Sequence, residues 1–257
     1  MFYYEYPEFE KKHLLKTEML EQLRDYPRRY AKLLFQGYGN GIVNGCELSW
    51  DENQLTINSG IIYWNENLYF METPYTLECY PEDRLRHLMV RFLNETKENG
   101  AICGKTNIYL TENPYDSDEM ELCRFRLQEG SRLRSVYVDF QDHTTEFDTV
   151  NRIHTPFASL GGSTISPEIL IQFAEEMMET EMLDPFDITL SMNILTNDGR
   201  VSRNAITQYL KIKNESSSVL DNNWNLYQEL LKIIKNRKKR NSASEEYNQK
   251  GKRIMLM

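Results

Sequence analysis

The segment from Gly41 to Met71 places the tightest limit on how this chain can fold. Apolar and polar residues alternate in it between glycine, asparagine and aspartate, as in short half-buried strands joined by tight turns. Cys46, Leu48 and Trp50 fall on one face of such a strand, after a turn predicted at Asn44–Gly45. The segment therefore predicts four short strands at the spacing of a meander.

Strand patterns continue beyond this segment. Tyr75–Leu77 and His87–Leu93 are predicted as strands because apolar side chains alternate with polar ones. The predicted core face of the longer strand consists of Leu88, Val90 and Phe92.

A further hairpin is predicted from Ile102–Leu110 and Met120–Leu127, which a polar connection joins. Strict alternation divides the second strand into a core face and an outer face that carries Leu122, Arg124 and Arg126. Its core residues are Cys123, Phe125 and Leu127. Leu133–Phe140 has the composition of one more strand.

The N-terminal part reads as an aromatic arm followed by a helix. From Leu14 to Phe35 apolar residues recur every three or four positions, which predicts an amphipathic helix. Because a proline inside a helix removes a hydrogen bond and clashes with the preceding turn, Pro27 predicts two helical pieces. Residues 1–12 alternate aromatic and acidic side chains, so they suit an arm that docks on a neighbour or an edge strand of the same domain.

Four helices are predicted in the C-terminal part. Serine or aspartate N-caps, two of them followed by proline, mark the first three starts. The starts are Ser166–Glu168, Asp184–Pro185, Ser202 and Trp224. The basic cluster Arg237–Arg240 lies in a tail that we expect to be disordered, or else to contact nucleic acid, an anionic surface or an acidic partner.

These patterns predict an α+β chain with an N-terminal helical entry, an antiparallel β-rich domain (a sandwich or a small barrel) and a helical C-terminal domain. The predicted boundaries are 1–36 for the arm and helices, 37–140 for the β-rich domain, 141–165 for a linker, 166–235 for the helical domain and 236–257 for the basic tail.

Charge and hydropathy exclude several classes of protein. The net charge of −9 argues against a general nucleic-acid binder, because phosphate contacts need a basic surface. The sequence has no apolar run of the roughly 18 residues that a membrane helix requires, and its start lacks the order of a signal peptide. We therefore expect a protein that stays in the cytoplasm or leaves it by a route that uses no such signal, with its four cysteines reduced and packed.

No motif in the sequence predicts a reaction. His143 with Asp139, Asp142, Glu146 and Asp148 is the only cluster dense enough to suggest a metal, but its spacing matches no calcium loop and favours a polar linker. The run Gly161–Thr164 precedes a helix, where free amide groups bind anions, yet its composition favours a flexible connector. We predict no enzyme, no cofactor and no metal.

Aromatic residues give the best candidate for a contact surface. In the β-rich part they occupy both faces of adjoining strands, so some must face outward, toward a sugar or another subunit. Together with the arm, the candidate interaction surface comprises Phe2, Tyr4, Tyr6, Tyr63, Trp64, Tyr69 and Phe70.

The order of several short motifs resembles that of phage tail and baseplate proteins. The motifs are G-I-V-N-G (Gly41–Gly45), L-x-I-x-x-G (Leu55–Gly60) and E-L-x-R-F-x-L-x-E-G (Glu121–Gly130), preceded by MLEQLRDYPRRY and followed by G-R-V-S-R-x-A-I. The whole chain is similar to a class found in contractile phages and phage-tail-like bacteriocins of low-GC Gram-positive bacteria. Some members of that class are labelled as nucleic-acid helicases, but this sequence has no Walker-type loop.

The resemblance implies a structural subunit of the baseplate of a contractile injection system. Such a subunit links wedge, hub or other tail components to receptor-binding fibres, or helps to trigger sheath contraction, within a symmetric hetero-oligomer. It is assembled in the bacterial cytoplasm and released with the particle, without membrane or nucleic-acid contacts and without catalytic residues. The alternatives are a carbohydrate- or receptor-binding module at the tail tip that uses the aromatic residues from Tyr63 to Phe70, and an enzyme such as a wall hydrolase.

Overall fold

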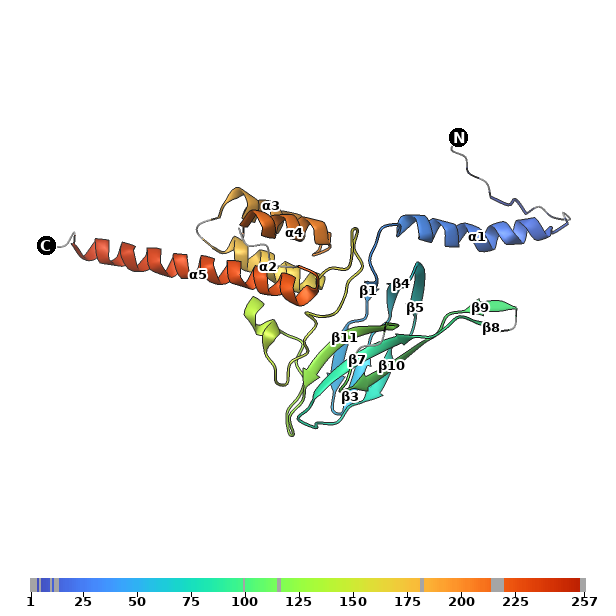
Figure 1. Cartoon of the computed structure of the whole chain (residues 1–257), viewed down its shortest axis with the longest axis horizontal. Coiled ribbons are helices and arrows are strands. Elements are labelled where there is room, and N and C mark those ends of the chain that lie inside the picture. Colours follow the sequence, from blue (N-terminus) through green and yellow to red (C-terminus); the bar gives the residue numbers. More distant parts are fainter. Residues whose placement is uncertain are drawn as a thin grey trace.

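The computed structural model describes residues 4, 6–9, 11, 14–98, 100–114, 117–180, 183–213 and 220–254, with side chains up to residue 239. It confirms the α+β class: one helix precedes a region of antiparallel sheets, and further helices follow. The first helix, α1, and the last, α5, extend toward opposite ends of the molecule, with the sheets between and below them (Figure 1).

The organising segment forms five strands in two sheets, so the predicted four-stranded meander is wrong. One sheet has the order β1-β4-β5, and the other has the order β2-β3-β6. The five strands are β1 (Gly41–Gly45), β2 (Leu48–Asp51), β3 (Gln54–Ile57), β4 (Gly60–Trp64) and β5 (Asn67–Met71); β6 (Tyr75–Glu78), which follows the segment, completes the second sheet.

The predicted turn at Asn44–Gly45 is also wrong, because both residues belong to β1 and face β4. The chain changes sheet at Cys46 instead, where φ is +60°. The Cys46 N–H donates to the Ser59 carbonyl oxygen at 3.1 Å, which holds this corner against the start of β4. A Cβ at Gly60 would lie 2.4 Å from the Cys46 sulfur, so the close approach requires glycine there.

A third sheet has the order β10-β7-β11, in which β7 (Leu85–Phe92) lies between β10 (Thr106–Thr111) and β11 (Glu119–Arg126). The predicted hairpin between the outer two strands is therefore wrong. The central place of β7 follows from its burial on both faces, since Leu88 and Met89 are both buried. β8 (Thr96–Glu98) and β9 (Ala101–Cys103) pair only with each other among the described strands.

The predicted core residues of these strands are confirmed, but the predicted outward position of Leu122 is wrong. Leu122 is 1% exposed and lies in the core, because a register shift between Glu121 and Cys123 interrupts the alternation along β11. The core residues of β7 and β11 belong to one cluster that also takes in side chains from β1, β2 and β3. Its members from the predicted faces are Leu88, Val90, Phe92, Cys123, Phe125 and Leu127. Leu133–Phe140 forms no strand; only an isolated bridge joins Arg134 to Thr149, because the chain here turns into the 3-10 helix η1 (Phe140–Thr144).

The segment 141–165, expected to be a linker with few apolar anchors, is packed. It bridges to β1 and to β11, through Ile42 with Phe157 and Arg124 with Asn151. Its buried polar side chains make hydrogen bonds that a sequence pattern does not reveal, such as Thr155 Oγ1 to the Leu122 carbonyl oxygen at 2.7 Å. Packing contacts thus continue from the β-rich part through this segment. The domain boundaries remain a prediction.

The four predicted C-terminal helix starts are confirmed. The helices are α2 (Pro167–Met178), α3 (Pro185–Thr196), α4 (Arg203–Lys213) and α5 (Asn223–Ile254). α5 continues to Ile254, so it includes most of the tail that we expected to be disordered. The physical reason is that lysine, arginine and glutamate are good helix formers, and the buried first part of the helix supplies the costly nucleus.

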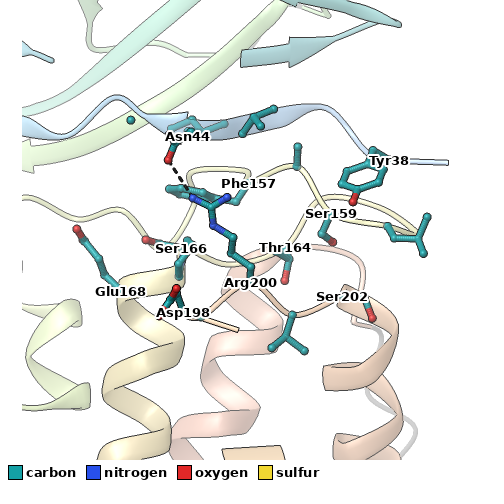
Figure 2. A pocket seen from close by; sticks show the side chains of 18 of the residues that line it. Tyr38, Asn44, Phe157, Ser159, Thr164, Ser166, Glu168, Asp198, Arg200 and Ser202 are labelled. Atoms are coloured by element: carbon teal, nitrogen blue, oxygen red, sulfur yellow. Dashed lines mark hydrogen bonds between the residues drawn. The ribbon is translucent and has the colours of Figure 1, made fainter. Parts of the chain in front are cut away.

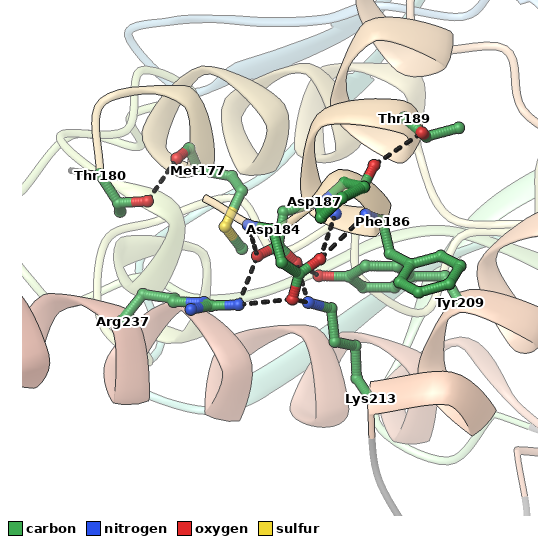
Figure 3. Close-up of polar contacts among 10 residues, drawn as sticks. Met177, Thr180, Asp184, Phe186, Asp187, Thr189, Tyr209, Lys213 and Arg237 are labelled. Atoms are coloured by element: carbon green, nitrogen blue, oxygen red, sulfur yellow. Dashed lines mark hydrogen bonds and ion pairs between the residues drawn. The ribbon is translucent and has the colours of Figure 1, made fainter. Parts of the chain in front are cut away.

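A buried ionic cluster joins α3, α4 and α5 (Figure 3). Asp187 is fully buried and accepts hydrogen bonds from Tyr209 Oη at 2.8 Å and from Arg237 Nη2 at 2.6 Å. Lys213 Nζ lies 2.6 Å from the same carboxylate and also contacts Asp184, whose side chain caps the start of α3. Two cations thus face two carboxylates, which fits a structural role for the cluster.

Candidate interaction surfaces

α1 (Thr17–Leu34) is one continuous helix that contains Pro27, so the predicted break into two pieces is wrong. Proline removes one backbone hydrogen bond and strains the preceding turn. In α1 water can solvate the freed carbonyl oxygen, because no residue of this fully described helix is buried.

The apolar side chains of α1 form a single exposed stripe. Met19, Leu23, Tyr26, Tyr30 and Leu33 follow one another at alternating spacings of four and three residues, which places them on one side of a helix. The α1 stripe comprises Met19, Leu20, Leu23, Tyr26, Tyr30, Leu33 and Leu34. Within it Leu23 is 50% exposed, Tyr26 and Tyr30 are 61% exposed, and Leu33 is 70% exposed.

The C-terminal end of α1 is fixed to the β-rich part. Phe35 stacks on Tyr63 with ring centroids 5.3 Å apart, and Lys32 forms an ion pair with Glu66 at 2.5 Å. From this anchor the helix extends away from the sheets (Figure 1). The α1 stripe is therefore held in place but left uncovered by the described part of the chain.

Most of the aromatic residues predicted for a contact surface in the β-rich part are packed inward. Tyr63 is buried, Trp64 stacks on Phe92 at 4.2 Å between ring centroids, and Tyr69 meets the edge of the same ring at 5.0 Å. Phe70 faces outward and is 65% exposed. Alternation along the strands allowed several of these aromatic rings to face solvent. Trp64 and Tyr69 instead pack against Phe92 inside the molecule.

In the arm, Tyr4 and Tyr6 are 82% and 73% exposed and stack on each other at 6.1 Å. Phe2 lies outside the described residues. The structure thus leaves Tyr4, Tyr6 and Phe70 exposed. The prediction omitted the α1 stripe, although its periodicity was visible, because periodicity does not tell whether a face is covered.

The polar cluster around His143 is divided among separate partners. Asp142 pairs with Arg134 at 2.6 Å, and Glu146 pairs with Arg126 at 3.0 Å. His143 Nε2 lies 2.6 Å from the Gln172 side-chain oxygen, and burial lowers the pKa of His143 to about 4. Among the residues that the structure describes, no group of three or more histidine, cysteine or acidic side chains is placed to hold a metal ion.

The run Gly161–Thr164 is not the flexible connector that its composition favoured. The Gly161 N–H donates to the Gly37 carbonyl oxygen at 2.9 Å, and the Thr164 N–H donates to the Phe157 carbonyl oxygen at 2.8 Å. These amide groups are engaged within the chain and do not offer the anion site that we considered.

The cysteines are free, as expected. Three of them are buried, and burial raises the pKa of the thiols of Cys46 and Cys79 to about 11 and that of Cys123 further still. Thiols held protonated in this way are poor nucleophiles.

Glu121 is buried and lies between His87 and Arg124. Burial disfavours its charge, but hydrogen bonds from His87 at 3.3 Å and from Arg124 at 2.7 Å hold the pKa of Glu121 at about 2. The carboxylate is thus neutralised by its own neighbours, which indicates a structural ion pair.

One cavity of about 580 Å³ lies where β1, the start of α2 and the loop before α4 meet. Figure 2 shows Arg200 reaching across it from that loop toward Asn44, to whose side-chain oxygen it donates at 2.9 Å. Like the α1 stripe, this cavity offers a partner a shaped surface.

None of the helices in the described ranges has the length and apolar character of a membrane span. No protein-family model and no curated protein matches this chain. Among solved structures, the chain is similar to a crystal structure of TssK, with a TM-score of 0.40 and 12% sequence identity. The alignment covers 91% of this chain and 69% of that chain.

Proposed function

We propose that this chain is a structural subunit of the baseplate of a contractile phage-tail-like particle. It acts through protein contacts, assembles in the cytoplasm and leaves with the particle. One observation carries the proposal: the α1 stripe is an ordered apolar helix face on which no described part of the chain packs.

The α1 stripe has the properties of a helix that docks into a partner. Burying one large apolar side chain stabilises a complex by about 1.5–3 kcal/mol before the costs of association. Contiguous exposed apolar surface marks interaction sites in soluble proteins. The spacing of four and three residues fits a partner helix or an apolar groove, in which such anchors line one face.

The remainder of the chain supports a scaffold role. The two apolar clusters, the packed segment 141–165 and the ionic cluster around Asp187 provide a fixed body from which α1 and the arm project. The motif order of the sequence favours the baseplate over other assemblies. Links to wedge or fibre proteins and a part in triggering contraction belong to the same proposal.

The test is purification of the tagged chain from cells that make the particle. We expect tail sheath and tube proteins to co-purify with the unaltered chain and to be lost with Leu23→Glu/Tyr30→Glu, which puts two carboxylates into the α1 stripe. Arg28→Glu is the matched control, because it adds a carboxylate on the opposite face of the same helix. A monomeric chain that never co-purifies with these proteins contradicts the proposal.

The alternative of a carbohydrate- or receptor-binding module now centres on Phe70, since Trp64 is stacked on Phe92. A glycan array probed with the unaltered chain and with Phe70→Ala distinguishes the two functions. Binding that Phe70→Ala abolishes supports the module, whereas loss of binding only with Trp64→Ala reflects disturbed packing.

A further inference from the structure

The cavity beside β1 has one buried charged group in its wall, Arg152, which is 6% exposed. A guanidinium carries five N–H donors and is costly to bury unless they find acceptors. Arg152 Nη2 is 3.4 Å from the Cys46 carbonyl oxygen, and Nη1 is 3.7 Å from Glu168 Oε2, beyond hydrogen-bond reach. Its Nε has no hydrogen-bond partner among the described residues.

Two hydroxyl groups in the same wall are also unpartnered. Thr164 Oγ1 and Ser166 Oγ are buried and lack hydrogen-bond partners within the described ranges. Ser166 is the N-cap of α2, and its side chain does not cap the helix. The N-terminus of a helix carries partial positive charge, so the buried guanidinium and the start of α2 make this wall of the cavity positive, with two unsatisfied hydroxyl groups beside them.

The acidic side chains around the cavity are exposed, in contrast to Arg152. Glu47, Glu168 and Asp198 all belong to the lining, and the Glu168 side chain is 59% exposed. Water screens such rim charges, whereas the buried guanidinium acts at low dielectric. The interior of the cavity therefore favours an anionic group. The Glu168 carboxylate lies too far from Arg152 to make a hydrogen bond in its place.

The mouth of the cavity is apolar. Leu34, Tyr38 and Leu160 line it and are 55%, 37% and 56% exposed. A ligand that fits both the positively charged interior and the apolar mouth of the cavity carries a carboxylate flanked by aromatic or aliphatic side chains. The arm of this chain has that composition: Tyr6 and Phe9 are 73% and 54% exposed and flank an acidic residue in the run YEYPEFE.

We infer that this cavity binds a glutamate side chain of an aromatic segment, and that the arm of a second copy of the chain supplies it. A second copy is favoured because the arm joins α1 at the end about 27 Å from the cavity, and its Tyr4, Tyr6 and Phe9 are 82%, 73% and 54% exposed rather than packed in the cavity of their own chain. The inference rests on the proposed function only in treating the arm as a contact element. It adds the receiving site and the chemistry of recognition.

The first experiment locates the arm. The full chain is made with p-benzoylphenylalanine in place of Tyr6, and natural-isotope and ¹⁵N-labelled preparations are mixed and irradiated. We expect cross-links between one light and one heavy chain that map to residues 152–168. Cross-links only within one chain, or to another surface or protein, overturn the inference and leave the proposed function standing. If neither cross-links nor co-purifying tail proteins are found, both fail.

The second experiment tests the carboxylate. A labelled peptide of residues 1–12, MFYYEYPEFEKK, is titrated with the full chain and followed by fluorescence anisotropy. Arg152→Gln is expected to weaken binding by about tenfold, the effect of losing a charge-assisted hydrogen bond. Glu168→Gln is expected to strengthen binding, because it removes a competing carboxylate.

Arg200→Gln covers the case in which Arg152→Gln fails to fold. Arg200 is exposed and spans the cavity, so its substitution leaves the core intact and is expected to weaken binding by roughly threefold. A peptide with its three glutamates changed to glutamine is the matched probe. Equal binding of the two peptides, or weaker binding to Glu168→Gln, overturns the carboxylate assignment.

Discussion

α1 and α2 are both amphipathic helices, but they differ in what covers their apolar side. In α2, five of 12 residues are buried, and Leu170 and Phe173 are fully enclosed. In α1 none of 18 is buried, and Leu23 and Leu33 are half exposed or more. The difference separates a helix that stabilises its own chain from one that is available to another protein.

The cause of the difference lies in the anchoring of each helix. α2 packs against α3, α5 and η1, so its apolar face is covered within the chain. α1 is attached at its C-terminal end, where Phe35 stacks on Tyr63, and then leads away from the body (Figure 1). Substitutions in the two helices should therefore affect different measurements.

The largest expected effect comes from Phe173→Ala in α2. It empties a fully buried site and should lower the free energy of unfolding by about 3–5 kcal/mol. Urea denaturation measures it. Leu33→Ala in α1, at a 70% exposed position, is the comparison and should change stability by less than about 1 kcal/mol. Equal losses would mean that α1 is covered in the isolated chain.

Asp187→Asn should lower the free energy of unfolding by about 3 kcal/mol, because it leaves Lys213 and Arg237 partly buried beside a neutral amide. Exposed Asp198→Asn, which has the same chemistry on the surface, is the control. Thermal or urea unfolding of both variants checks the prediction. A neutral outcome for Asp187→Asn would show that the cluster does not hold α3, α4 and α5 together.

Acid should weaken the helical core through His143. Burial holds the pKa of His143 at about 4, below the ordinary value of 6.5, so the unfolded chain binds a proton more readily than the folded one. Stability is then complete above pH 6.5 and is lost as the pH falls toward 4, by up to about 3 kcal/mol. Urea unfolding midpoints across this range measure how steeply stability depends on pH. His143→Gln should make that dependence weaker. If the dependence stays the same, other titrating groups cause it.

The smallest effect on stability is expected for Leu23→Glu in the α1 stripe, within about 0.5 kcal/mol of the unaltered chain, as for surface substitutions. The same variant should nonetheless abolish association, because a carboxylate in a buried helix contact is costly. Urea unfolding and co-purification from the same preparation separate the two effects. If Leu23→Glu lowered stability while the partners still co-purified, α1 would be a helix that stabilises its own chain and not one that binds another protein.

Sequence alone determined the elements whose signals are local. Ser166–Pro167 and Asp184–Pro185 marked helix starts, and alternation identified Leu88, Val90 and Phe92 as the core face of β7, because caps and side-chain direction depend on a few neighbouring residues. The spacing of apolar residues in the sequence also indicated the α1 stripe. These features are set by short-range geometry and persist whatever surrounds them.

Only the tertiary structure decided which strands pair, which aromatic residues are covered and where the cavity lies. An alternating strand reads the same beside any neighbour, so β7 between β10 and β11 could not be foreseen. The partial burial of Trp64 depends on Phe92, and the cavity joins Arg152 to the start of α2. Such contacts arise between residues distant in the chain, and the sequence pattern around each residue contains no record of its partner.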